Sequence, residues 1–321
     1  MGIQNNYVLE NGKLNDSLIV KREVLYKGPN GREVERIFVL SATSYIFKPL
    51  STVEEDNKEI WIYENILPSF PSIYPKIIDK SPDDSKNTRW IIYEDLGNIR
   101  HLFTEKVVLQ VIEQMITWHS LRIDTVINEP LIGAKPKIEE VRNDLHSNMD
   151  EGMQTFSPLG MDKERILRIL KLMEEADFTQ FPVLVHGDLH LGNYGLSHGK
   201  LVIMDWEHVH VNTRYCDLYH LLDLSHPLFP KTMEREFRSH ILNQYYERAV
   251  MNGLNLSLKD FTFEYYLYAC VFSLWMILLI QKDLVCKEEK WPKKTLRNQM
   301  NESLQSFEQC SLELFEILKN R

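Results

Sequence analysis

The chain has 321 residues, of which 44% are hydrophobic and 26% charged, and its formal net charge is -9. This length exceeds what one small hydrophobic core can hold, so it favours two domains or lobes. The acidic balance and the lack of a dense lysine and arginine stripe argue against nucleic acid as the main partner. The charge permits a cationic small molecule as a ligand, although an acidic surface that keeps the chain soluble is the simpler explanation.

The pattern of cysteines and the N-terminal residues indicate the cellular compartment to expect. The four cysteines show neither a CxxC pair nor the spacing of a zinc site, and the first residues lack the apolar segment of a signal peptide. We therefore expect free thiols and a cytoplasmic protein. The uncharged, aromatic-rich segment 265–280 is shorter than the roughly 20 residues that span a membrane. We expect it to form a helix buried in a large lobe, with no membrane partner.

The N-terminal part is rich in β-branched and aromatic residues, which predicts an antiparallel meander of three strands between residues 23 and 47. Residues 28–31, GPNG, are a turn signal, and this turn could lie over phosphates or be an ordinary hairpin turn. Lys48 ends the apolar run SYIFK directly before Pro49. It could reach a phosphate as a point charge, or lie at an edge and face water.

A helix should follow this meander, because Thr52 and Glu55 have the spacing of a capping box at the start of the segment 52–67. Glu59 lies beside the apolar side of this helix and could turn inward to pair with Lys48. Most glutamates on a helix surface are merely solvated. The competing partners for Lys48 are the other glutamates of the helix, Glu54, Glu55 and Glu64.

A second hairpin is predicted from YPKIID and RWIIYEDLG, which are separated by the polar stretch SPDDSKNT. After its apolar strand ends, helical patterns dominate the sequence. This change predicts an α+β protein with a domain boundary after Leu96. Residues 1–96 would form an antiparallel β lobe with one helix, and residues 97–321 would form a larger helical lobe. Helices are expected in that lobe at 104–121, 137–149, 161–176, 218–224, 232–251, 259–281 and 293–319.

The residues that carry chemistry are concentrated in VHGDLHLGN, residues 185–193, and in the LVIMDWEH run that follows. Two glycines allow tight turns here, and the short strand LVIM delivers Asp205 next to the first loop. Asp188 could accept a hydroxyl proton, while the amide oxygen of Asn193 and the carboxylate of Asp205 complete the all-oxygen set that Mg²⁺ prefers. In such chemistry, catalysis comes from positioning and from charge neutralisation around a phosphoryl group.

HGDLHLGN and MDWE resemble the paired signatures of the aminoglycoside phosphotransferase and choline kinase family, whose bilobal fold is similar to that of protein kinases. With SYIFK, KEIWIYENIL and WIIYEDLGN in the expected order, the resemblance covers about residues 20 to 280. GPNG does not match a glycine-rich kinase loop, and MDWE stands where protein kinases have DFG.

The resemblance implies a kinase that uses ATP and Mg²⁺. It implies that Asp188 is catalytic, that Asn193 and Asp205 hold the metal, and that Lys48, paired to Glu59, contacts the nucleotide phosphates. By the same similarity, the backbone C=O of Glu94 and N–H of Leu96 would hold the nucleotide base, and His186 would brace the catalytic loop.

The acceptor is expected to be a small molecule with a hydroxyl group, such as an aminoglycoside, another amino-containing antibiotic, choline or an amino alcohol. Both antibiotic resistance and ordinary metabolism fit this class. Carboxylates beyond the metal strand could bind an amine, and Glu207 is the best candidate because it follows that strand directly. The others, which could equally be surface or helix-capping acids, are Asp217, Asp223 and Asp260.

Two rival functions are open from the sequence. A hydrolase could use a metal cluster of the acids and histidines in this region, but HGDLH does not reproduce the HxHxDH or HExxH patterns. A kinase-fold module that only binds ligands is the other rival. It predicts damage to the catalytic set, and the members of that set are all intact: Lys48, Asp188, Asn193 and Asp205.

Overall fold

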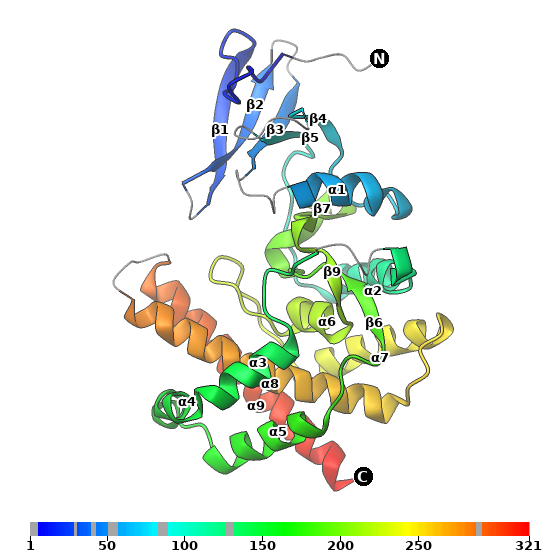
Figure 1. Ribbon diagram of the computed structural model, residues 1–321, viewed down its shortest axis with the longest axis vertical. Coiled ribbons are helices and arrows are strands. Elements are labelled where there is room, and N and C mark those ends of the chain that lie inside the picture. The colour runs from blue at the N-terminus through cyan, green and yellow to red at the C-terminus, as the bar shows by residue number, and fades with distance from the viewer. Residues whose placement is uncertain are drawn as a thin grey trace. The chain divides into compact units, whose positions relative to one another are not determined.

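The computed structural model describes residues 6–28, 31–39, 43–50, 57–82, 89–125, 131–286 and 291–320 (Figure 1). Backbone contacts divide the chain into two compact units. The first contains 1–100 and 196–207, and the second contains 101–195 and 208–321. The division thus falls after Arg100 rather than after Leu96, and the segment 196–207, expected in the helical domain, groups with the first unit. The proposed capping box at Thr52 and Glu55, with Glu54, and the middle of the GPNG turn lie outside the described residues.

An antiparallel sheet with the strand order β1-β2-β3-β5-β4 forms the frame of the first unit (Figure 1). Strand β5 lies between β3 and β4, so both its edges are hydrogen-bonded, and its apolar residues WIIY are all buried, as the continuous apolar run predicts. Edge strand β1 is largely exposed. The strands are β1 (Ile19–Lys27), β2 (Glu33–Val39), β3 (Ser44–Pro49), β4 (Ile77–Lys80) and β5 (Trp90–Glu94).

The first unit also contains helix α1 (Asn57–Asn65) and the hairpin strand β8 (Lys200–Ile203). Strand β8 pairs with β7 (Tyr194–Ser197), which crosses the division between the units. A bridge between Arg100 and Leu196 ties this hairpin to the segment after β5. The hairpin therefore carries the residues that follow β8 into the unit that holds β3 and α1.

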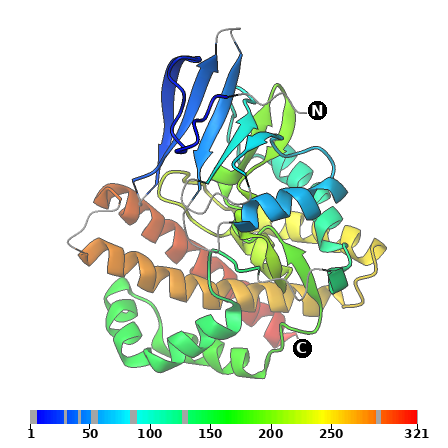
Figure 2. The same ribbon diagram turned by 45° about the horizontal axis from the view of Figure 1, so that its top comes forward.

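The second unit is mainly helical, and its two longest helices run side by side in both views (Figures 1 and 2). Strand β6 (Pro182–Val185) pairs antiparallel with β9 (His210–Thr213), a strand that the sequence did not predict because HVNT has no apolar run. The predicted helix 137–149 is present as α3, which ends at its C-cap Asn148, and a further helix that the sequence did not predict, α4, follows it directly. The helices are α2 (Glu105–His119), α3 (Ile138–Ser147), α4 (Met149–Phe156), α5 (Lys163–Glu175), α6 (Tyr215–Leu222), α7 (Arg235–Met251), α8 (Leu258–Val285) and α9 (Lys293–Lys319).

Helix α8 contains the apolar segment 265–280. It is long and apolar enough to cross a membrane, but 78% of its most apolar window is buried inside the fold. Burial on all sides explains why the helix has no polar face. The segment is therefore a core helix of the second unit, as predicted.

Candidate active site

Lys48 is the centre of a charged cluster within the first unit. It leaves β3 with its Nζ 3.0 Å from Glu59 Oε1 on α1, so the predicted pair is present. The hairpin brings two further carboxylates to the same ammonium group: Asp205 Oδ1 at 3.0 Å and Glu207 Oε2 at 3.2 Å. The competing partner Glu64 instead pairs with Lys80. The first unit thus gathers three carboxylates around one lysine.

The three carboxylates of this cluster shift the pKa values of Glu59 and Lys48. Burial raises the pKa of Glu59 to about 7 against the opposing effect of Lys48, and the charges of Glu207 and Asp205 add to the increase. Burial would lower the pKa of Lys48, but the three carboxylates outweigh it and hold this pKa well above its usual value. The hydroxyl of Tyr93 donates to Glu59 at 2.7 Å and fixes that carboxylate.

The same carboxylates fit a divalent cation. One oxygen from each of Glu59, Asp205 and Glu207 lies within 4.8 Å of the others, and the lysine balances only one of the three charges. An all-oxygen donor set suits Mg²⁺ better than zinc. Asp205 itself has a positive φ of 61°, a conformation that is costly for a residue other than glycine and that concentrates at functional sites.

The segment predicted to hold the nucleotide base directly follows β5. Asp95 receives a bidentate pair from Arg36, at 2.7 and 3.2 Å, and Ser197 donates to the Leu96 carbonyl at 2.5 Å. These contacts hold Asp95 and Leu96 in place, at and next to the predicted binding groups. Base recognition by the Glu94 C=O and the Leu96 N–H stays a prediction.

Asp188 and Asn193 lie in the second unit, on the loop that leaves β6. The Asn193 Nδ2 group donates to the Asp188 carbonyl at 2.7 Å and to the Asp188 carboxylate at 3.3 Å. Because its nitrogen faces the loop, the amide oxygen is the atom that a cation would use. His186 Nδ1 accepts from the Asp188 N–H at 3.3 Å, which is the bracing role predicted for this histidine.

Asp217 on α6 holds the start of this loop. Its fully buried carboxylate accepts from the N–H groups of His186 at 2.8 Å and of Gly187 at 3.0 Å. Trp118 Nε1 donates to it at 2.9 Å, and His119 Nε2 lies 3.2 Å away. Burial alone would raise the pKa of Asp217, but the hydrogen bond and charge of His119 and these donors hold it well below its usual value. Asp217 therefore holds the start of the catalytic loop in place.

Lys135 is a residue of this site that the sequence reasoning missed. It forms a short ion pair with Asp188, and both side chains are largely buried, with 20% and 15% of their surface exposed. Burial would raise the pKa of Asp188, but Lys135 and then His190 lower it well below its usual value. The stretch GAKPK has no motif character, so only the fold could reveal this contact.

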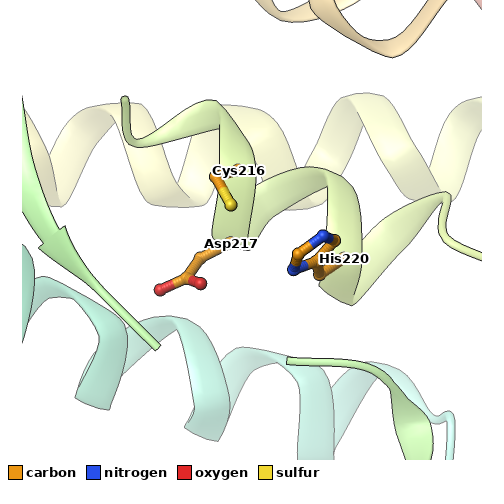
Figure 3. A group of neighbouring side chains, drawn as sticks. All are labelled: Cys216, Asp217 and His220. Carbon is orange, nitrogen blue, oxygen red and sulfur yellow. The ribbon is translucent and has the colours of Figure 1, made fainter. Parts of the chain in front are cut away.

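A buried group on α6 could in principle ligate a metal, and Figure 3 shows the side chains of Cys216, Asp217 and His220 projecting from this short helix. Asp217 already accepts hydrogen bonds at both oxygens. Among the described residues, the candidate metal groups are this one and the Glu59 group, and neither contains the histidines of the HGDLH motif that the hydrolase alternative would use. His190 instead stacks on His226 with a centroid distance of 4.3 Å.

The other carboxylates proposed for amine binding also have structural roles. Asp223 is fully paired with Arg238 at 2.7 Å, and it accepts from Ser306 at 2.7 Å and from Tyr265. Ser257 caps the start of α8, and its hydroxyl donates to the Asp260 carboxylate at 2.6 Å. Among the candidates, Glu207 faces the Lys48 cluster, and its role toward substrate stays a prediction.

Comparisons with known proteins bear on the fold and on one stretch of the sequence. Residues 135–253 match the model of the phosphotransferase enzyme family. A comparison with curated proteins finds no match. A GDP complex of an aminoglycoside 2'-phosphotransferase of type IIIa has a TM-score of 0.58 at 16% identity and covers 94% of both chains. Macrolide 2'-phosphotransferase type I has a TM-score of 0.56 at 13% identity, covering 88% of this chain and 91% of its own.

A choline kinase from Cryptosporidium parvum Iowa II has a TM-score of 0.53 at 14% identity, covering 95% of this chain and 93% of its own. The predicted resemblance and the predicted α+β, kinase-like fold are both confirmed. The chain therefore has the fold of aminoglycoside phosphotransferases and choline kinase, and its residues 135–253 carry the sequence pattern of the phosphotransferase enzyme family.

Proposed function

We propose that the protein transfers the γ-phosphoryl group of ATP to a hydroxyl of a small molecule, with Mg²⁺ as cofactor. The observation that carries this proposal is the pairing of Lys48 with Glu59 beside Asp205 in the first unit. A lysine held between carboxylates is suited to nucleotide phosphates, because its ammonium group can be shared with a phosphate while the acids hold the cation.

The reaction would have a simple balance. The acceptor oxygen forms a bond to the γ-phosphorus, the bond from that phosphorus to the β,γ-bridging oxygen breaks, and ADP leaves. Asp188 orients the hydroxyl and takes its proton as the new bond forms. Bound Mg²⁺ would neutralise the phosphate oxygens, and Asp205 and Asn193 are the residues that would hold it, with Glu207 adjacent.

The acceptor is proposed to be an amine-bearing alcohol, such as the aminoglycosides and choline after which the solved relatives are named. The net charge of -9 favours a cationic compound over an anionic one. Glu207 is the carboxylate that we propose for this contact. The four free cysteines support a reducing compartment, and we propose the cytoplasm.

Two measurements test the proposal in sequence. Titration calorimetry with ATP should show binding that requires Mg²⁺, and Lys48→Met should weaken it. Release of ADP should then rise above the basal rate for at least one member of a panel of hydroxylated amines and antibiotics. Nucleotide binding without stimulation by any acceptor would favour the alternative, a kinase-fold module that binds but does not catalyse. Zinc binding without nucleotide binding would contradict both readings.

A further inference from the structure

A lysine from a distant part of the chain contacts the catalytic loop of the second unit. Lys135 lies on the segment 131–137, which precedes α3, whereas Asp188 follows β6. Their side chains form an ion pair with little exposure to solvent. A charge-assisted contact between largely buried groups is screened less by solvent and is better oriented than an exposed pair.

The segment that bears Lys135 is held against the catalytic loop through one histidine ring. A Cβ atom on Gly133 would lie 2.4 Å from Cε1 of His210, and a Cβ on Gly187 would lie 2.8 Å from Nδ1 of the same ring. The ring therefore lies between two chain segments that approach it without side chains. Such close backbone approach is a position where glycine is required.

The ring itself has little freedom to move. His210 is buried, its Nδ1 donates to the His208 carbonyl at 2.8 Å, and its Nε2 accepts from Asn212 Nδ2 at 2.9 Å. Strand β9, which carries His210, pairs with β6 directly before the catalytic loop. Gly133, the ring and Gly187 thus form a fixed stack that sets where Lys135 meets Asp188.

We propose that Lys135 is a positioning residue for phosphoryl transfer, and that docking of residues 131–137 on His210 places its ammonium group against the Asp188 carboxylate. The proposal rests on the proposed kinase function. In the absence of Lys135, one carboxylate oxygen loses its partner, and the side chain can leave the orientation that receives the acceptor hydroxyl. Misplacement of a reacting group by about 1 Å costs on the order of 100-fold in rate.

Steady-state kinetics with ATP and a stimulating acceptor test this role. Lys135→Met should lower kcat by about 10- to 100-fold, with the KM for ATP within about twofold of the wild-type value, because nucleotide contacts are assigned to the first unit. Lys135→Arg should restore most of the loss, since it keeps the charge. The matched control is Lys137→Met, an exposed lysine of the same segment, which should leave kcat unchanged.

A second variant separates placement from charge. Gly133→Ala leaves Lys135 intact, but its new Cβ cannot fit against the His210 ring unless the ring or the segment 131–137 moves. It should therefore lower kcat, as Lys135→Met does, while ATP binding is kept. If Lys135→Met keeps the wild-type kcat, or if Lys137→Met loses as much, the proposal is overturned even though the enzyme is a kinase.

A readout without turnover keeps the two failures distinct. In protein with ¹⁵N-labelled lysine, the Nζ resonance that disappears in Lys135→Arg should shift in Asp188→Asn and stay unchanged in Asp124→Asn. A Lys135 resonance that is insensitive to Asp188→Asn would refute the contact. If no acceptor is phosphorylated by the wild type, the kinase proposal fails, and with it the positioning role, whatever the spectrum shows.

Discussion

Replacement of Asp217 by alanine should severely destabilise the second unit. The change removes the acceptor of two backbone N–H groups, those of His186 and Gly187, and of the indole N–H of Trp118. Each buried donor left without a partner costs about 1–3 kcal/mol, so the three together cost about 3–9 kcal/mol, toward the lower end if water enters. Asp217→Asn should be less stable than the wild type and more stable than Asp217→Ala. It keeps one acceptor oxygen but turns an NH₂ group toward another donor.

The assay is urea unfolding followed by fluorescence, combined with hydrogen exchange of the peptide that contains His186 and Gly187. The two amides should lose protection in Asp217→Ala, while the exposed control Asp124→Ala should change the unfolding free energy by less than about 0.5 kcal/mol. The pKa of Asp217 is lowered in the folded state, so its contribution is present above about pH 4 and is lost as the pH falls toward that lowered pKa. The difference in unfolding free energy between the wild type and Asp217→Ala should therefore become smaller at acidic pH. If Asp217→Ala lowers the unfolding free energy by less than about 1 kcal/mol at pH 7 and both amides stay protected, Asp217 does not hold the loop in this way.

Three further outcomes are expected. Lys48→Met should abolish most Mg²⁺-dependent ATP affinity in calorimetry while thermal unfolding shows a folded chain; unchanged affinity would contradict the assigned phosphate contact. Gly187→Ala should destabilise the fold and inactivate the enzyme, because the new Cβ would lie 2.2 Å from the His208 carbonyl at a φ of 80°; a wild-type melting curve would argue against this packing. Burial lowers the pKa of Lys231 to about 7, so the folded state binds fewer protons than the unfolded state from there up to about pH 10. Stability should therefore rise with pH across that window in the wild type, and the rise should shrink in Lys231→Met but not in the exposed control Lys163→Met.

The local elements of the fold could be read from the sequence where one pattern dominates. The continuous apolar run WIIY predicts the interior strand β5, and the spacing of Asp188 and Asn193 with a later Asp205 indicates phosphoryl-transfer chemistry. Lys48 at a strand end and Glu59 beside the apolar side of a helix were enough to suggest their pair, which the structure contains.

Contacts between distant segments could not be read in this way. Asp217 looks like a surface acid of a helix, and only the fold brings it to Trp118 of α2 and to the amides of the loop that follows β6. Asp223 was a candidate for amine binding, yet Arg238, which no local pattern links to it, neutralises it in the core. The contact of Lys135 with Asp188 likewise depends on the packing of Gly133 against His210, which no local pattern predicts.

We propose that this chain transfers a phosphoryl group to an acceptor hydroxyl and that Asp188 is the catalytic residue. The most direct measurement is the transfer of label from γ-labelled ATP to the acceptor that stimulates ADP release, compared between wild type, Asp188→Asn and the control Asp124→Asn. We predict labelled acceptor with wild type and control when Mg²⁺ is present, and a rate at least about 100-fold lower with Asp188→Asn. Labelled acceptor at the wild-type rate with Asp188→Asn, or ADP release by the wild type without labelled acceptor, would contradict the claim.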